Sequence, residues 1–184
     1  MPSPIGHSLM GYLFYRSTQR PLGTRQWTRI GLFVLAANAA DLDFLPGLFV
    51  GDLSRFHHGP SHSIGFAIFF GLLASLFVSR RGYAFVMASS LYLSHVVLDY
   101  LIQDPSPPHG VPLFWPLSHE YYMAPFAFFP RFDYASSSAG PLLSPIFTLH
   151  NLLTVCVEAA LLSPLFILAR QCKKQIQKSR TNQA

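Results

Sequence analysis

The chain has 184 residues, of which 51% are hydrophobic and only 11% are charged. Because about a quarter of the residues in a soluble globular domain are charged, this composition and the mean hydropathy of +0.32 favour a membrane protein. The net charge of +5 does not indicate nucleic-acid binding, since the basic residues form short clusters beside apolar runs and no aromatic-interleaved stripe. The two cysteines, Cys156 and Cys172, have no metal-ligand spacing and predict no disulfide framework.

Five apolar segments are expected to form helices, at residues 5–15, 30–50, 64–79, 83–102 and 142–169. The fourth segment has the ~20 residues needed to cross the hydrocarbon core, and the fifth exceeds that length. The first would extend only ~17 Å and is expected to be a short, tilted or half-buried helix. The pattern predicts an all-α polytopic membrane bundle of about four to five segments with one irregular non-cytoplasmic connection. A single domain is expected over residues 1–170, followed by a basic cytoplasmic tail at 171–184.

The positions of the basic residues predict the orientation of these segments. Eleven of the thirteen Lys and Arg fall on one side of an alternating five-segment arrangement, and only Arg55 and Arg131 fall on the other. Loops rich in Lys and Arg stay in the cytoplasm, so we expect a cytoplasmic C-terminus. The same arrangement places several scattered His and Asp residues together on the non-cytoplasmic side.

His95 and Asp99 form the most informative pair. At positions i and i+4 of a helix they project from the same face, and both interrupt an apolar run, where an ionisable residue indicates function. The alternative is a His–Asp hydrogen bond within the bundle. Asp41 and Asp43 end another apolar stretch, and two carboxylates this close repel each other unless a cation lies beside them. Pro46 and Gly47 predict that the helix stops after this pair.

The densest group of histidines lies between His57 and Ser63, where Gly59 and Pro60 break any helix. Imidazole is a common ligand for zinc, so His57 and His62 are candidate ligands, with Ser61 or Ser63 available to cap the next helix. His58 is expected to contact the ligands or a phosphate group, not the metal.

The remaining ionisable residues are weaker candidates for a role in the site. His7 becomes a ligand candidate only because the topology places it beside the others. Glu158 must face the bundle interior and is a candidate acid or base, in the same run as His150. For His109 and His119 the sequence favours exposure to solvent.

The motifs are similar to those of the membrane-bound metal-dependent hydrolases of bacteria, the LexA-regulated inner-membrane, YdjM-type family. The resemblance covers nearly the whole chain and runs through Pro4–His7, Asp41–Asp43, His57–Ser63, His95–Asp99 and Gly110–Pro116. In this chain Ala40 replaces a proline of the family pattern, and His58 stands where the family usually has arginine. The resemblance implies a site made of His7, Asp41, Asp43, His57, His62, His95 and Asp99. The family's ligand pattern also resembles that of the all-helical zinc phospholipases C, which implies phosphoester chemistry.

We therefore expect a multi-pass protein of the bacterial inner membrane that hydrolyses a phospholipid or another lipid-linked ester with metal-activated water. Zinc is favoured, as one or two ions, with manganese as the alternative. Asp41 or Asp43 would bridge two ions or act as general base. No nucleic-acid partner is expected. The alternatives are a metal transporter or sensor without hydrolytic activity, a haem-binding electron carrier, and a purely structural membrane protein.

Overall fold

The computed structural model describes residues 1–18, 25–52, 55–103, 109–133 and 146–181. Its helices are α1 (Pro4–Ser17), α2 (Gln26–Ala37), the 3₁₀ helix η1 (Ala39–Asp43), α3 (Phe44–Val50), α4 (Ile64–Leu76), α5 (Arg81–Tyr100) and α6 (Leu149–Thr181). The described residues contain no strand, only one isolated antiparallel bridge between Val111 and Tyr122. The prediction of an all-α fold is confirmed.

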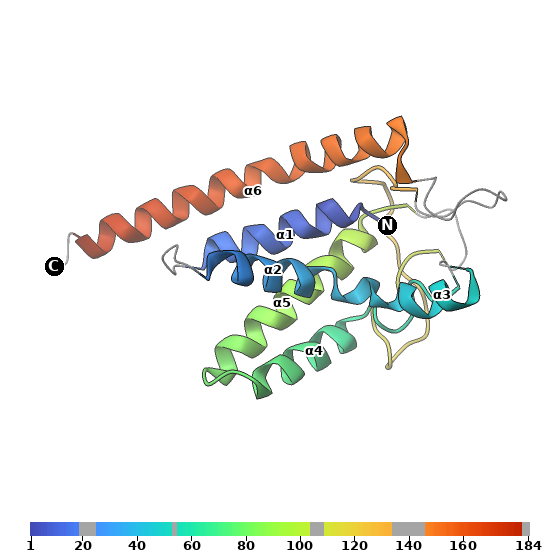
Figure 1. Cartoon of the computed structure of the whole chain (residues 1–184), viewed down its shortest axis with the longest axis horizontal. Coiled ribbons are helices and arrows are strands. Elements are labelled where there is room, and N and C mark those ends of the chain that lie inside the picture. Colours follow the sequence, from blue (N-terminus) through green and yellow to red (C-terminus); the bar gives the residue numbers. More distant parts are fainter. Residues whose placement is uncertain (19–24, 53–54, 104–108, 134–145, 182–184) are drawn as a thin grey trace.

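The helices form layers, with α1 lying between α6 and the helices α2 and α5, and with α4 packed against α5 (Figure 1). The α4–α5 pair approaches closely at Gly71. A Cβ there would overlap Ser89 Oγ and lie 2.8 Å from the carbonyl oxygen of Phe85. The outer faces of α4 and α6 expose large apolar side chains such as Phe69, Leu72 and Leu153, as expected for surfaces that face lipid.

By length and composition, one described helix can cross a membrane, the Leu149–Gln171 portion of α6. A second candidate is the pair formed by α2 with η1 and α3, which is bent by 62°. Helix α4 is apolar but shorter, and the 20-residue α5 is not a candidate because polar residues such as Ser90 and His95 dilute its hydropathy. The number of four to five membrane segments stays a prediction. Helix α6 continues across the boundary predicted at residue 170, and the first residues of the expected run 142–169 lie outside the described ranges.

The helix expected in the apolar run 30–50, with a stop at Pro46 and Gly47, ends earlier, before the aspartates. Helix α2 ends at Ala37, where the side-chain amide of Asn38 donates to the carbonyl of Val34 at 2.8 Å and to Ser8 Oγ at 3.2 Å. The expectation that Pro46 stops the helix is wrong. Pro46 lies in the first turn of α3, where its missing N–H would have no helical partner in any case. Asp41 and Asp43 lie on η1, at the bend between α2 and α3.

An irregular connection over residues 109–133 ties together the end of the bundle that holds the histidines. The N–H of Ile64, at the start of α4, donates to the carbonyl of Leu113 at 3.0 Å, and Ala124 donates to the carbonyl of Tyr100 at 2.8 Å. Ser63 caps α4, because its hydroxyl accepts a hydrogen bond from the N–H of Phe66. The His57–Ser63 loop is therefore anchored at its C-terminal end.

Candidate metal centre

The seven residues implied as ligands come from four separate parts of the chain and lie together. His7 is on α1, Asp41 and Asp43 are on η1, His57 and His62 are on the loop before α4, and His95 and Asp99 are on α5. All five that are not on η1 are buried. Asp41 and Asp43 are half-buried and lie on the side of the cluster nearest the surface.

Four atoms at the centre of the cluster face one another: Nε2 of His62, Nε2 of His95, Oδ1 of Asp41 and Oδ2 of Asp99. His95 Nε2 lies 3.3 Å from His62 Nε2 and 3.1 Å from Asp99 Oδ2. His62 Nε2 lies 3.4 Å from Asp99 Oδ2. Asp41 Oδ1 lies 3.3 Å from His95 Nε2 and 3.7 Å from His62 Nε2.

These five separations of 3.1–3.7 Å are close to the spacing of neighbouring ligand atoms around a tetrahedral metal ion. When a zinc ion binds nitrogen and oxygen ligands at about 2.0–2.1 Å, neighbouring ligand atoms are separated by about 3.3–3.4 Å. Asp41 Oδ1 and both carboxylate oxygens of Asp99 are buried and have no hydrogen-bond partner among the described residues. These oxygens contact the imidazoles of His7, His62 and His95 but accept no hydrogen bond from the described residues, and buried carboxylates are costly unless a cation compensates them. The donor set and its geometry therefore fit a divalent cation at this point.

The two histidines at the centre are held with Nε2 facing inward. His95 Nδ1 is 2.8 Å from the carbonyl oxygen of Ala37, the last residue of α2, and donates its proton there. His62 Nδ1 lies 3.1 Å from Asp43 Oδ2. Such partners fix the tautomer and ring orientation of metal-binding histidines. In both rings they leave the Nε2 lone pair available to a cation.

Asp43 contacts three side chains of the His57–Ser63 loop. Its Oδ1 lies 3.0 Å from His57 Nδ1, and its Oδ2 accepts a hydrogen bond from Ser61 Oγ at 2.8 Å, as well as facing His62. The two aspartates therefore make different contacts. Asp41 contributes one of the four atoms at the centre, whereas Asp43 contacts the histidines and Ser61 of the loop.

His7 contacts the two ligand candidates of α5. Its ring stacks on that of His95 with centroids 3.7 Å apart, and its Nε2 is 3.7 Å from Asp99 Oδ1. His7 is fully buried, and neither of its ring nitrogens has a hydrogen-bond partner among the described residues. His7, His95 and Asp99 form a second group of ligand atoms close enough to hold an ion.

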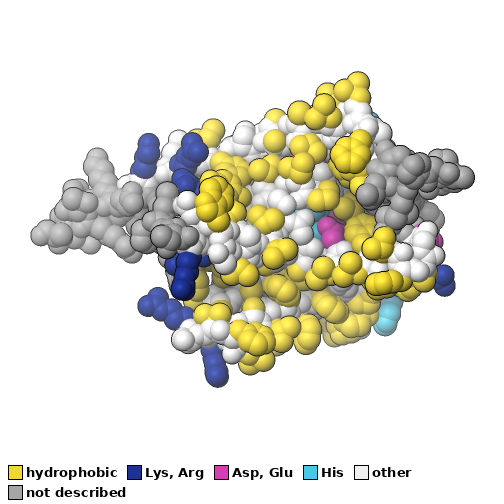
Figure 2. All heavy atoms as spheres, in the orientation of Figure 1, with side chains coloured by type: hydrophobic (Ala, Val, Ile, Leu, Met, Phe, Trp, Pro, Cys, Tyr) yellow, Lys and Arg dark blue, Asp and Glu magenta, His cyan; other side chains and the backbone are white. Residues whose placement is uncertain are grey.

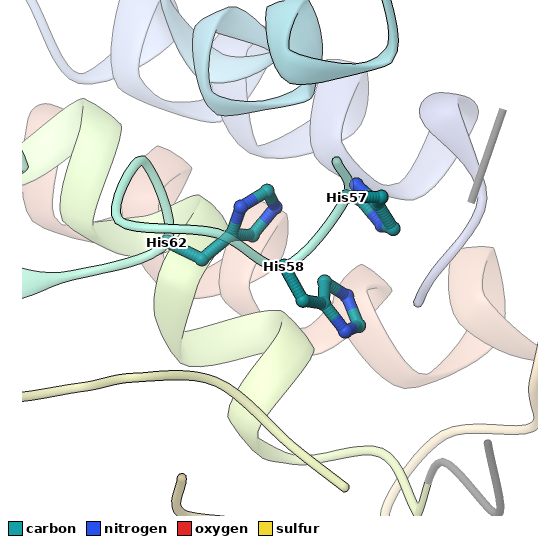
Figure 3. Close-up of side chains that lie close together, drawn as sticks. All are labelled: His57, His58 and His62. Atoms are coloured by element: carbon teal, nitrogen blue, oxygen red, sulfur yellow. The ribbon is translucent and has the colours of Figure 1, made fainter. Parts of the chain in front are cut away.

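The loop histidines His57, His58 and His62 form another such group (Figure 3). His58 is buried and has a φ of 60°, a left-handed backbone conformation that non-glycine residues rarely adopt. The sequence predicts that His58 lies outside the set of metal ligands. Its position in the sequence does not indicate that the backbone conformation brings its ring close to His57 and His62.

Asp41 and Asp43 affect the pKa values of the loop histidines His57 and His62 in different ways. Burial lowers the pKa of His62, but Asp41 and Asp43 outweigh that effect and raise it to about 9. Burial dominates at His57 and lowers its pKa, although Asp43 opposes the shift. A cation at His62, whether a proton or a metal ion, therefore compensates the surrounding carboxylates.

Glu158 is buried on α6 but uses its carboxylate elsewhere. It accepts hydrogen bonds from the N–H of Ser3, at 2.7 Å, and from the Ser3 hydroxyl, at the start of α1. A Cβ at Gly6 would lie 2.7 Å from its Oε2. The described groups of candidate ligands do not include Glu158.

The remaining histidines lie outside the cluster. His109 and His119 are exposed. His150 is also exposed, and its Nε2 lies 2.9 Å from the carbonyl oxygen of Arg131.

The fold and this cluster define a class: an all-helical membrane protein with buried His and Asp groups that could hold a metal ion. The YdjM inner membrane protein family matches residues 1–176, nearly the full chain. The chain belongs to this family. No curated protein and no solved structure matches it.

Proposed function

We propose that this inner-membrane protein is a metal-dependent hydrolase whose divalent ion, zinc by preference, is bound by His62, His95, Asp41 and Asp99. The observation that supports the proposal most directly is the set of five separations of 3.1–3.7 Å among their ligand atoms. Two imidazoles with two carboxylates suit zinc, and the carboxylates leave manganese as the alternative. When bound, such an ion lowers the pKa of a coordinated water and polarises the scissile group.

The other proposed roles belong to Asp41, Asp43, His7 and Glu158. Asp41 is the most accessible of the four, with 14% of its side chain exposed against 0% for His62, His95 and Asp99. It is therefore the carboxylate that can receive a proton from an incoming water. Asp43 orients His62 and His57, and His7 packs against the ring of His95. Glu158 acts through Ser3 and fixes the start of the helix that carries His7.

The substrate that we propose is a membrane-associated ester, such as a phospholipid or another lipid-linked phosphoester. The exposed residues next to the accessible aspartates are apolar, among them Leu42, Leu45 and Phe49. An amphiphile lying in the bilayer can bring its head group to Asp41 while its chains stay in contact with these side chains.

One observation favours a second function, metal binding without hydrolysis. Four protein ligands complete a tetrahedron, and closed sites are typical of structural zinc, whereas catalytic zinc usually has three protein ligands and a water. A metal transporter is less well supported, because the described residues near the basic end of the bundle include no Asp, Glu or His to continue a pathway.

Two measurements on the full chain purified in detergent test the proposal. Elemental analysis is expected to find about one zinc or manganese per chain, and His95→Ala or Asp99→Ala should remove most of it, since each loses a ligand. His119→Ala, at an exposed histidine outside the cluster, is the matched control and should keep the metal. Metal retained in both site variants would refute the ligand assignment.

The second measurement is hydrolysis of a generic phosphodiester. Turnover should disappear with a chelator, return when metal is added back, and fall strongly in Asp41→Asn. Full metal content without turnover on phosphodiesters or phospholipids would establish the non-hydrolytic alternative. Turnover that resists the chelator would exclude metal-dependent chemistry.

A further inference from the structure

A second site lies at the other end of α1 and α6, away from the metal centre. Tyr12 and Arg16 of α1 and Phe166, Ala169 and Arg170 of α6 line a small, shallow pocket that opens to the surroundings. The rings of Tyr12 and Phe166 stack with centroids 6.0 Å apart and form its wall. The pocket therefore combines two guanidinium groups with an aromatic surface between two packed helices.

The level of the pocket in the membrane follows from α6, the helix that forms half of it. The portion of α6 able to span a membrane ends at Gln171, so Arg170 lies where the hydrocarbon core gives way to the lipid head groups. Arg16 is in the last turn of α1 and lines the same pocket. Both guanidinium groups are consequently expected at the level of the lipid phosphates.

Nothing in the described part of the chain neutralises these two arginines. The ion pairs among the described residues include neither Arg16 nor Arg170. Most Lys and Arg side chains in Figure 2 gather at this end, and the Asp and Glu side chains in that view lie elsewhere. Two positive charges beside an apolar wall are complementary to an anion that has an apolar body.

We propose that this pocket binds the phosphate of an anionic phospholipid. Arginine offers a planar fork of donors that matches phosphate oxygens in pairs, so Arg16 and Arg170 together can hold one phosphate from two helices. The acyl chains would lie along the aromatic wall formed by Tyr12 and Phe166. The lipid would thus bridge α1, which carries His7 at its other end, to α6. This site is separate from the metal centre and does not depend on its activity.

The test is native mass spectrometry of the full chain in detergent with added phosphatidylglycerol or phosphatidylcholine. The wild-type protein should retain phosphatidylglycerol in preference to phosphatidylcholine. The double variant Arg16→Gln/Arg170→Gln should bind it about 30-fold more weakly, since each basic residue near a membrane surface contributes on the order of a fivefold gain. The matched control is Arg80→Gln/Arg81→Gln, which removes the same charge at the exposed α4–α5 turn and should retain the lipid as the wild type does.

Three results would overturn the proposal. Equal loss of lipid in the two double variants would mean that only the overall surface charge matters. Equal retention of phosphatidylcholine and phosphatidylglycerol would remove the role of charge. Displacement of the lipid by millimolar inorganic phosphate would show a site for a free anion and not for a lipid.

If the double variant does not fold, Ala169→Trp provides an independent test, because it fills the pocket and keeps both arginines. Loss of phosphatidylglycerol in this variant, with unchanged metal content and helicity, is the expected result. Retention of the lipid at wild-type affinity would place it outside the pocket and contradict the proposal.

Discussion

At the scale of single residues, two aspartates two positions apart do different things. Asp41 Oδ1 faces the imidazoles of His62 and His95 at 3.7 and 3.3 Å. Asp43 accepts a hydrogen bond from Ser61 and faces His57 and His62 with both oxygens. From the sequence, either residue could bridge two ions or act as base. These contacts support the proposal that Asp41 would contact an ion and that Asp43 orients the rings.

Asp43→Asn is expected to weaken zinc affinity about 10- to 100-fold, because partners of this kind orient metal-binding histidines and increase their basicity. Competition of the purified protein with a chromogenic zinc chelator measures this affinity. Glu120→Gln removes an exposed carboxylate and should leave the affinity unchanged. Unaltered zinc affinity in Asp43→Asn would contradict the orienting role, whereas complete loss of zinc would indicate that Asp43 is itself a ligand.

At the scale of elements, a buried carboxylate of α6 contacts the start of α1, one of the helices that carry the candidate ligands. Glu158 accepts two hydrogen bonds at Ser3, which caps α1, and Ser3 also accepts from the N–H of Gly6 at 3.0 Å. His7 follows within the first turn of α1. The position of His7 therefore depends on a contact that α6 supplies from more than 150 residues away in the chain.

Glu158→Ala should destabilise the protein by about 1–3 kcal/mol, since it leaves buried donors of Ser3 without partners. Glu158→Gln keeps an acceptor oxygen and should retain most of the stability and metal content. Thermal unfolding in detergent and elemental analysis measure the two quantities. A Glu158→Gln variant with normal stability and metal but no hydrolysis would show that Glu158 is an acid or base of the reaction.

At the scale of the whole molecule, the basic side chains and the candidate metal ligands lie at opposite ends. Most Lys and Arg side chains in Figure 2 lie at the end where α1 finishes, and His7 lies at the start of that helix. The irregular connection over residues 109–133 is tied to the site end through Tyr100 and Ile64. This separation is what the rule relating positive charge to cytoplasmic loops predicts for a site on the far side of the membrane.

A fluorescent protein fused to the C-terminus should be active, and alkaline phosphatase at the same point should not, because the basic tail is expected in the cytoplasm. The opposite pattern is expected when the reporters are inserted after Leu117, an exposed residue of the irregular connection. Phosphatase activity at the C-terminus would reverse the predicted orientation.

The sequence by itself determined the helical class, the candidate ligands and the clustering of basic residues. Each of these depends on neighbours in the chain: apolar composition, the spacing of His95 and Asp99 by one helical turn, and glycine with proline in the loop before α4. The family resemblance rests on the same short motifs.

Only the tertiary structure decided where the helix breaks, which atoms face one another, and which contacts Glu158 and His58 make. The helix ends at Ala37 because Asn38 bonds back to Val34 and across to Ser8, and that end supplies the carbonyl that orients His95. These features depend on packing between segments that are distant in the sequence. This packing determines the orientation of each histidine ring and the polar group that it contacts. Local patterns carry no information about either.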